Sequence, residues 1–194
     1  MIKSLFPTLV FEKVITDPNF SIIQEELSIA LSNEKFLKIR ELEHPNIGNL
    51  LGTSGIINLD NNFIEDNNYK LDEFKTLIVN SASEYLSGVK NPYKIAIKNS
   101  WVTKFLPGNN GQAHDHFSNM LSGVYYFKAT GNEGNLKFMN PLTYDNFVGA
   151  LDFEIIPITG KLVLFPGWLK HQVLQNNSLN ERISIAFNLE LFYE

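Results

Sequence analysis

The sequence of 194 residues contains no cysteine, which excludes disulfide bonds and thiolate metal sites. Any metal must then be held by histidine, aspartate or glutamate side chains. Long apolar runs are also missing: none approaches the length of a membrane span, and the N-terminus lacks the uninterrupted apolar core of a signal peptide. These absences favour a soluble, cytoplasmic protein.

Negatively charged side chains are in modest excess over positively charged ones. The chain has 16 lysines and arginines against 21 aspartates and glutamates, so its formal net charge is −5. This balance provides no electrostatic footprint for nucleic acid or for an anionic membrane surface. We therefore expect neither as a partner, and no pattern in the sequence indicates an oligomeric state.

The length is that of one domain, and a chain of this size can bury roughly 70 per cent of its unfolded surface in a core. We predict a single domain over residues 1–194. It divides into a helical N-terminal part, residues 1–92, and a β-rich core, residues 93–194. No internal repeat or interdomain linker interrupts the chain.

The N-terminal part begins with a predicted strand over residues 7–15, which contains both β-branched and aromatic residues. Two amphipathic helices follow, over residues 18–32 and 69–87, because apolar side chains recur there at spacings of three and four. Asp17 is suited to cap the first helix, with Pro18 at its first position. Everything after the second helix is predicted to be strand.

The C-terminal part consists of short β-prone runs separated by turns rich in glycine, proline and asparagine. Eight strands are expected, over residues 93–106, 112–117, 120–128, 134–139, 153–158, 161–166, 171–174 and 181–192. Helices first and antiparallel strands afterwards favour an α+β fold whose β part is a two-sheet jelly roll. In the last strand Ile183 and Ile185 alternate with Arg182 and Ser184, so we place the aliphatic face under the helices and the Arg182 face inside the barrel.

Histidine is scarce, and two of the four histidines lie two residues apart, at His114 and His116. In an extended strand both point to the same side, while Asp115 points to the other. Such a pair can chelate a divalent metal if a third ligand comes from elsewhere. His171, 55 residues after His116, is the best candidate. A His-x-His pair alone often has no function, so the second segment is essential to the interpretation.

Six segments carry a resemblance to a known family. They are LFPT at 5–8, NSW at 99–101, HDH at 114–116, SGVYYF at 122–127, LFPGWLKH at 164–171 and ERISIAFN at 181–188. Together they resemble the 2-oxoglutarate and Fe(II) dependent dioxygenase superfamily, and in particular a bacterial and phage-borne group of its oxygenases. The resemblance covers nearly the whole chain and thins between about residues 15 and 95. It implies a double-stranded β-helix with the N-terminal helices packed on the larger sheet.

The metal motif of that superfamily is His-x-Asp or His-x-Glu, then a distant histidine, then an arginine about ten residues later. Here Arg182 follows His171 by eleven residues, but position 116 is histidine where the superfamily usually has a carboxylate. Asp115 is displaced by one position. Strand alternation predicts that His116 binds the metal together with His114 and His171, whereas a β-bulge would bring in Asp115 instead.

The resemblance also implies the chemistry. Three protein ligands on Fe(II) leave two positions for a chelating 2-oxo acid and one for dioxygen. Decarboxylation of 2-oxoglutarate would give succinate and carbon dioxide while a substrate C–H bond is hydroxylated. Arg182 would pair with the distal carboxylate of 2-oxoglutarate, and Ser184 would add a hydroxyl donor. Tyr126 matches the strand position from which a tyrosine of related enzymes reaches that carboxylate.

The substrate is not indicated by the sequence and could be a protein side chain such as proline or a small metabolite. Two other functions stay open, namely a three-histidine dioxygenase of the cupin type that needs no 2-oxo acid, and a jelly-roll binding or sensor module. Arg182 and Ser184 separate the dioxygenase from both. We further expect a lid over residues 141–152, a loop position without function for His44, and packing at the pocket for Trp101.

Overall fold

The computed structural model describes residues 7–32, 56–58, 62–87, 93–117, 119–141 and 152–193. His44 lies outside these ranges, as does nearly all of the lid expected over residues 141–152. In the described residues, none of the helices has the length and apolar character of a membrane span.

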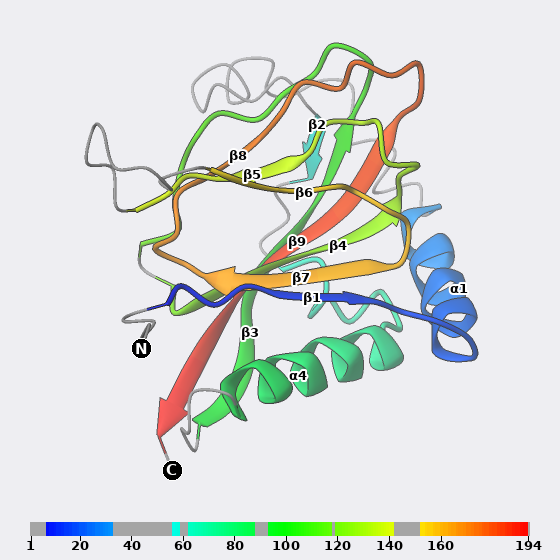
Figure 1. Ribbon diagram of the computed structural model, residues 1–194. Helices are drawn as coiled ribbons and strands as arrows, with labels where there is room; N and C mark the ends of the chain where they lie inside the picture. Colours follow the sequence, from blue (N-terminus) through cyan, green and yellow to red (C-terminus); the bar gives the residue numbers. More distant parts are fainter. Residues whose placement is uncertain are drawn as a thin grey trace.

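The larger sheet contains six of the described strands, in the order β1-β7-β4-β9-β3-β2, and every neighbouring pair is antiparallel (Figure 1). Their bounds are Phe11–Val14 for β1, Ile56–Asn58 for β2, Tyr93–Phe105 for β3, Leu121–Lys128 for β4, Lys161–Pro166 for β7 and Arg182–Tyr193 for β9. The sheet thus takes edge strands from the N-terminal part of the chain and central strands from its C-terminal half.

The smaller sheet faces one side of the larger one (Figure 1). Its three strands lie in the order β6-β5-β8. Their bounds are Leu136–Phe138 for β5, Phe153–Ile155 for β6 and His171–Val173 for β8. Leu136, Phe138 and Ile155 pack against Val163 and Phe165 of β7 to form the core between the two sheets. The predicted α+β fold with a two-sheet jelly roll is confirmed.

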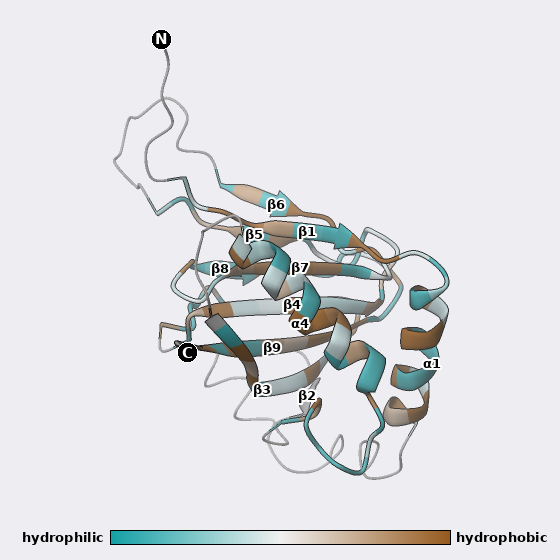
Figure 2. Cartoon of the chain, turned by 90° about the horizontal axis from the view of Figure 1, so that it is seen from below, coloured by the Kyte–Doolittle hydropathy of each residue, from teal (hydrophilic) through white to brown (hydrophobic). Residues whose placement is uncertain are grey.

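Two helices, α1 (Asn19–Leu31) and α4 (Asp72–Ser87), cover the other side of the larger sheet (Figures 1 and 2). Leu27 and Ile78 of these helices are fully buried in one cluster with Ile185 and Phe187 of β9. Burial of each such side chain contributes about 1.5–3 kcal/mol, so the pattern of β9 fixes which side of the sheet the helices occupy. The predicted aliphatic face of the last strand therefore lies under the helices.

The start of each helix differs from the expectation. Pro18, not Asp17, occupies the cap of α1, and the Asp17 carboxylate instead accepts a hydrogen bond from the backbone N–H of Ser21 at 3.2 Å. The second helix begins at residue 72, three residues later than expected. There the carboxylate of Glu26, on α1, accepts bonds from the N–H groups of residues 73 and 74 at 3.0 Å each. This cap is supplied by another helix and leaves no local sequence signal.

The strand expected over residues 112–117 is wrong. Within it only His114 forms a bridge, to His171. The backbone N–H of His116 then donates to the carbonyl of Gly167 at 2.8 Å, so the segment turns onto a loop rather than continuing along a strand. The other predicted strands form, most of them shortened by one to three residues.

Candidate metal centre

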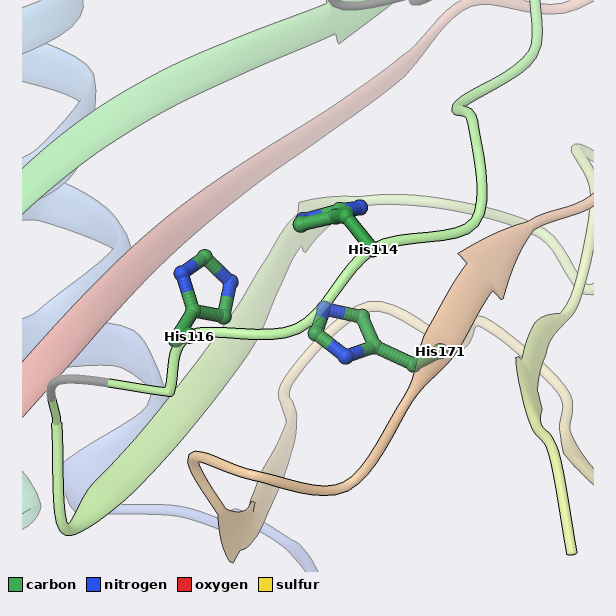
Figure 3. A group of neighbouring side chains, drawn as sticks. All are labelled: His114, His116 and His171. Carbon is green, nitrogen blue, oxygen red and sulfur yellow. The ribbon is translucent and has the colours of Figure 1, made fainter. Parts of the chain in front are cut away.

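Three histidine side chains converge between the two sheets (Figure 3). One ring nitrogen from each of His114, His116 and His171 can be chosen so that all three lie within 4.8 Å of one another. Among the described residues this is the only group of three or more histidine, aspartate or glutamate side chains close enough to share a metal ion. The two distant segments singled out in the sequence are thus brought together.

Backbone hydrogen bonds hold two of these histidines directly opposite each other. His114 and His171 exchange two hydrogen bonds, each backbone N–H donating to the other's carbonyl at 2.9 Å. His116 is anchored two residues further on, by its bond to the carbonyl of Gly167. Gly167 has no substitute there, because an added Cβ would lie 2.1 Å from the carbonyl oxygen of Asn119. The close approach of these loops aligns the three rings.

Hydrogen bonds from Nδ1 to backbone carbonyls set the tautomers of two of the imidazole rings. Nδ1 of His114 lies 2.8 Å from the carbonyl of Gln112, and Nδ1 of His171 lies 2.9 Å from the carbonyl of Leu169. A carbonyl only accepts, so each Nδ1 must carry the proton. Nε2 of His114 and of His171 therefore keeps its lone pair, which is the form that binds a metal.

Burial lowers the pKa of two of the three histidines. Desolvation, followed by repulsion from a charged His114, lowers the pKa of His171 to about 3. The same causes lower the pKa of His116 to about 4. The His171 ring packs with its centroid 4.8 Å from that of Phe165, which excludes water on that side. At neutral pH both imidazoles are uncharged, as metal binding requires.

Asp115 does not join the cluster. Its side chain is exposed, and its carboxylate accepts a bond from the backbone N–H of Phe117 at 3.3 Å. No bulge re-aims it toward His114 and His171, so the geometry groups His116 with them. This arrangement is what strand alternation predicted, although the segment is not a regular strand.

A cavity of about 470 Å³ opens beside the histidines, within the range of small-molecule sites. Its floor is the inner face of the larger sheet, where side chains of β3, β9 and β4 stand in rows across the strands. Trp101, Ala186 and Val124 form one such row, and the Trp101 ring lies 5.8 Å from that of His116. Trp101 is therefore half-buried at the pocket, as expected.

Arg182 lies in the same cavity and is only 2% exposed. Its Nη1 donates to the backbone carbonyl of Gly134 at 2.9 Å, and its guanidinium carbon lies 4.5 Å from the centre of the Phe105 ring. Its Nε is buried and has no hydrogen-bond partner in the described part of the chain. None of the described carboxylates forms an ion pair with it, so burial lowers its pKa. The edge formed by Nε and Nη2 is left for a ligand.

Ser184 and Tyr126 are directly paired across β9 and β4, and both are buried beside Arg182. Burial raises the pKa of Tyr126 to about 12, so its hydroxyl stays protonated and can donate. The three residues expected to bind a carboxylate are thus brought to one end of the cavity.

Sequence reasoning missed the loop that positions Arg182. The Glu133 side chain is fully buried and accepts bonds from the N–H groups of Thr130, Gly131 and Asn132 at 2.8–3.1 Å. Burial alone would raise the pKa of Glu133, but a hydrogen bond from the Thr130 hydroxyl, together with these backbone bonds, lowers it. Gly134 follows with φ +88°, and a Cβ there would lie 2.1 Å from the carbonyl oxygen of Leu174. The GNEG run signalled only a turn, whereas its fixed carbonyl orients the guanidinium.

A jelly roll with three histidines at the mouth of an inter-sheet cavity has the architecture of a non-haem metal enzyme. Residues 99–188 match the model of a family described as "Putative 2OG-Fe(II) oxygenase". The matched span includes the three histidines, Tyr126, Arg182 and Ser184. This part of the chain, somewhat less than half of it, thus resembles the 2-oxoglutarate and Fe(II) dependent oxygenases.

Solved structures show the same fold. A prolyl-4-hydroxylase from Pseudomonas putida matches with 13% identity and a TM-score of 0.63, over 93% of this chain and 92% of the other. A prolyl hydroxylase from Trichoplax adhaerens, in complex with a peptide fragment of hypoxia inducible factor, matches with 16% identity and a TM-score of 0.64, over 93% of this chain and 82% of the other. The carbocyclase SnoK from nogalamycin biosynthesis matches with 11% identity and a TM-score of 0.64, over 96% of this chain and 83% of the other. No curated protein matches the sequence.

Proposed function

We propose that His114, His116 and His171 bind the Fe(II) of this oxygenase and that Arg182, Ser184 and Tyr126 bind its 2-oxoglutarate. The observation that carries the proposal is Arg182, a buried cation whose Nε lacks a partner and which lines the same cavity as the histidines. A buried guanidinium with an unused edge suits a carboxylate ligand.

The residues present fit both groups. The imidazoles of His114, His116 and His171 would hold a divalent iron and leave coordination positions open for further ligands. When bound, Fe(II), 2-oxoglutarate and dioxygen supply the chemistry that yields succinate and carbon dioxide and oxidises a C–H bond. The protein holds and orients these partners and keeps water from the site.

At the other end of the cavity the guanidinium is held ready for its ligand. Nη1 of Arg182 donates to the carbonyl of Gly134, so the edge formed by Nε and Nη2 can receive the distal carboxylate of 2-oxoglutarate in a bidentate pair. The hydroxyls of Ser184 and Tyr126 donate to the same carboxylate. The Phe105 ring shields the opposite side of the guanidinium and strengthens the pair by lowering the local dielectric.

The substrate is proposed to be a protein side chain such as proline or a small metabolite, in the cytoplasm. Two observations support an organic substrate with apolar surface: Phe117 and Trp168, in the loops beside His116 and His171, are 83% and 46% exposed. The similar structures include enzymes for both substrate types, since one holds a peptide fragment and SnoK belongs to nogalamycin biosynthesis.

The proposal is tested with the purified chain under anaerobic conditions. Adding Fe(II) and then 2-oxoglutarate is expected to give a visible charge-transfer band, because a chelated 2-oxo acid absorbs when bound to ferrous iron. Admission of air should bleach this band and release succinate. If 2-oxoglutarate leaves the spectrum of the iron-loaded protein unchanged, the co-substrate assignment is wrong and the three-histidine dioxygenase without a 2-oxo acid takes its place.

A matched pair of variants tests the middle ligand. His116→Ala is expected to lower Fe(II) affinity by at least about 100-fold, because loss of a ligand costs more than loss of a residue that only supports a ligand. Asp115→Ala should leave the affinity within about twofold. The reason is that His116 lies in the cluster while the Asp115 carboxylate is exposed. Titration with Fe(II) under argon measures both. Loss of binding in Asp115→Ala alone would restore a two-histidine, one-carboxylate site.

A further inference from the structure

A row of three hydrogen-bonded polar side chains begins in the cavity, at Ser122, and crosses the inner face of the larger sheet. Ser122 on β4, Asn188 on β9 and Asn99 on β3 stand opposite one another in the sheet register. The Ser122 hydroxyl donates to Oδ1 of Asn188 at 2.7 Å, and Nδ2 of Asn188 donates to Oδ1 of Asn99 at 2.7 Å. Burying a row of polar side chains costs free energy unless the donors and acceptors at both ends of the row also form hydrogen bonds.

The row faces the cavity side of the sheet. It is in phase with the neighbouring row of Trp101, Ala186 and Val124, which lines the cavity, because residues two apart on a strand share a face. Ser122 lines the cavity itself. The polar row therefore lies on the same face of the sheet as the proposed co-substrate site, further along the strands, and extends from the cavity at Ser122 to Asn99 beyond its lining.

The direction of the bonds leaves one donor group unused. Each oxygen in the row accepts from the preceding residue, so the row ends at the amide nitrogen of Asn99. Ser122 and Asn188 are 2% exposed, whereas Asn99, the last residue of the row, is half-buried. In the part of the chain that the structure describes, this nitrogen donates no hydrogen bond. The bond from Asn188 fixes the plane of this amide group, and Asn99 is partly exposed.

This end is separate from the site proposed for 2-oxoglutarate. Arg182 and Asn188 are six residues apart on β9, which corresponds to about 20 Å along a strand. A five-carbon acid bound to Arg182 does not span that distance. The apolar row of Trp101, Ala186 and Val124 lies between the two polar ends, and the Trp101 ring is next to His116. This face of the sheet thus has two polar positions, far enough apart for two different molecules.

We infer that Asn99 is a specificity-determining residue that binds the primary substrate by donating its amide N–H to a carbonyl or carboxylate oxygen. The inference deepens the proposed function and rests on it for the identity of the co-substrate. It assigns the substrate a chemical feature, an oxygen acceptor next to the C–H bond that is oxidised. Trp101 beside Asn99 would pack against the apolar part of the same molecule.

The test uses the full chain loaded with Zn²⁺ and saturating 2-oxoglutarate, so that the histidine and arginine sites are filled and the protein is diamagnetic. N-methylacetamide and acetate serve as probes of a neutral and an anionic acceptor. The side-chain amide signal of Asn99 is identified in ¹⁵N spectra by its loss in Asn99→Asp. Both probes are expected to shift this signal and the indole N–H signal of Trp101 in a saturable manner.

Asn99→Asp keeps the oxygen that accepts from Asn188 and removes the donor. Monitored at the Trp101 indole, it should weaken N-methylacetamide binding about fivefold, the scale of one neutral hydrogen bond, and acetate binding more than that because of like charge. Asn19→Asp makes the same change at the exposed start of α1 and should alter neither affinity. Asn99→Ala replaces Asn99→Asp if the latter does not fold.

The inference is overturned if the Asn99 signal moves only linearly with probe concentration, or if Asn99→Asp and Asn19→Asp bind the probes equally. Failure of the proposed function would look different. It would show as absent binding of 2-oxoglutarate before any probe is added, while the response of Asn99 to the probes would be unaffected.

Discussion

Replacing His171 by alanine is expected to abolish iron binding, with a loss of affinity of at least about 100-fold. The expectation follows from the central place of this side chain. Its ring lies 4.5 Å from that of His114 and 5.2 Å from that of His116, and its Nε2 keeps a lone pair because Nδ1 donates to Leu169. Two remaining imidazoles form a poor chelate. Equilibrium dialysis against Fe(II) under argon measures the affinity.

Loss of the ring also removes packing, since His171 is buried against Phe165. His171→Leu keeps much of the apolar volume and separates lost ligation from lost folding. Circular dichroism without metal should show both variants folded. His44→Ala, at a histidine that we expect to have no function, is the matched control and should bind iron as the parent does. Undiminished affinity in folded His171→Leu would remove His171 from the site.

Arg182→Lys is expected to weaken 2-oxoglutarate binding to the iron-loaded protein by at least about 30-fold. A lysine keeps the positive charge but cannot present two parallel N–H groups, and it would leave the carbonyl of Gly134 without its donor. Truncating one side of a buried hydrogen-bonded charge pair costs roughly 2–5 kcal/mol, and 1.4 kcal/mol is a factor of ten. The charge-transfer band titrated with 2-oxoglutarate gives the dissociation constant.

The control for this variant is available within the chain, which has only one other arginine. Arg40→Lys makes the identical chemical change and should leave the dissociation constant unaltered. Iron affinity should stay within about twofold in both variants, because neither changes a histidine. If Arg182→Lys binds the co-substrate as tightly as the parent, Arg182 has a structural role and the carboxylate must be bound elsewhere.

Much of the fold could be predicted because alternation and helical spacing are local signals. The pattern of β9 separated Ile185, which packs under the helices, from Arg182, which lies in the cavity. The misjudged parts depend on distant residues. Residues 112–117 were expected to be a strand, but pairing stops after His114 because the chain then turns onto Gly167. The start of α4 is set by Glu26, 46 residues earlier.

The candidate site shows the same division. The spacing of the histidines and the phase of Arg182 with Ser184 can be recognised in the sequence. What holds Arg182 cannot, because its partner is a backbone carbonyl, and every residue has one. Only the folded loop shows that Gly134 is fixed in a left-handed conformation and that Glu133 secures it from inside. The polar row ending at Asn99 likewise exists only once three strands are in register.

The paired backbone bonds between His114 and His171 have a consequence for which metal the protein carries. Since folding itself sets these two imidazoles side by side, the nitrogen donors are already in place before a metal ion binds. Metal binding then requires little further ordering of the chain. A rigid, all-nitrogen site ranks divalent ions by their intrinsic preference, in which nickel and copper exceed iron. The cell's supply of free ions, rather than the chelating strength of the protein, would then decide whether ferrous iron is the occupant.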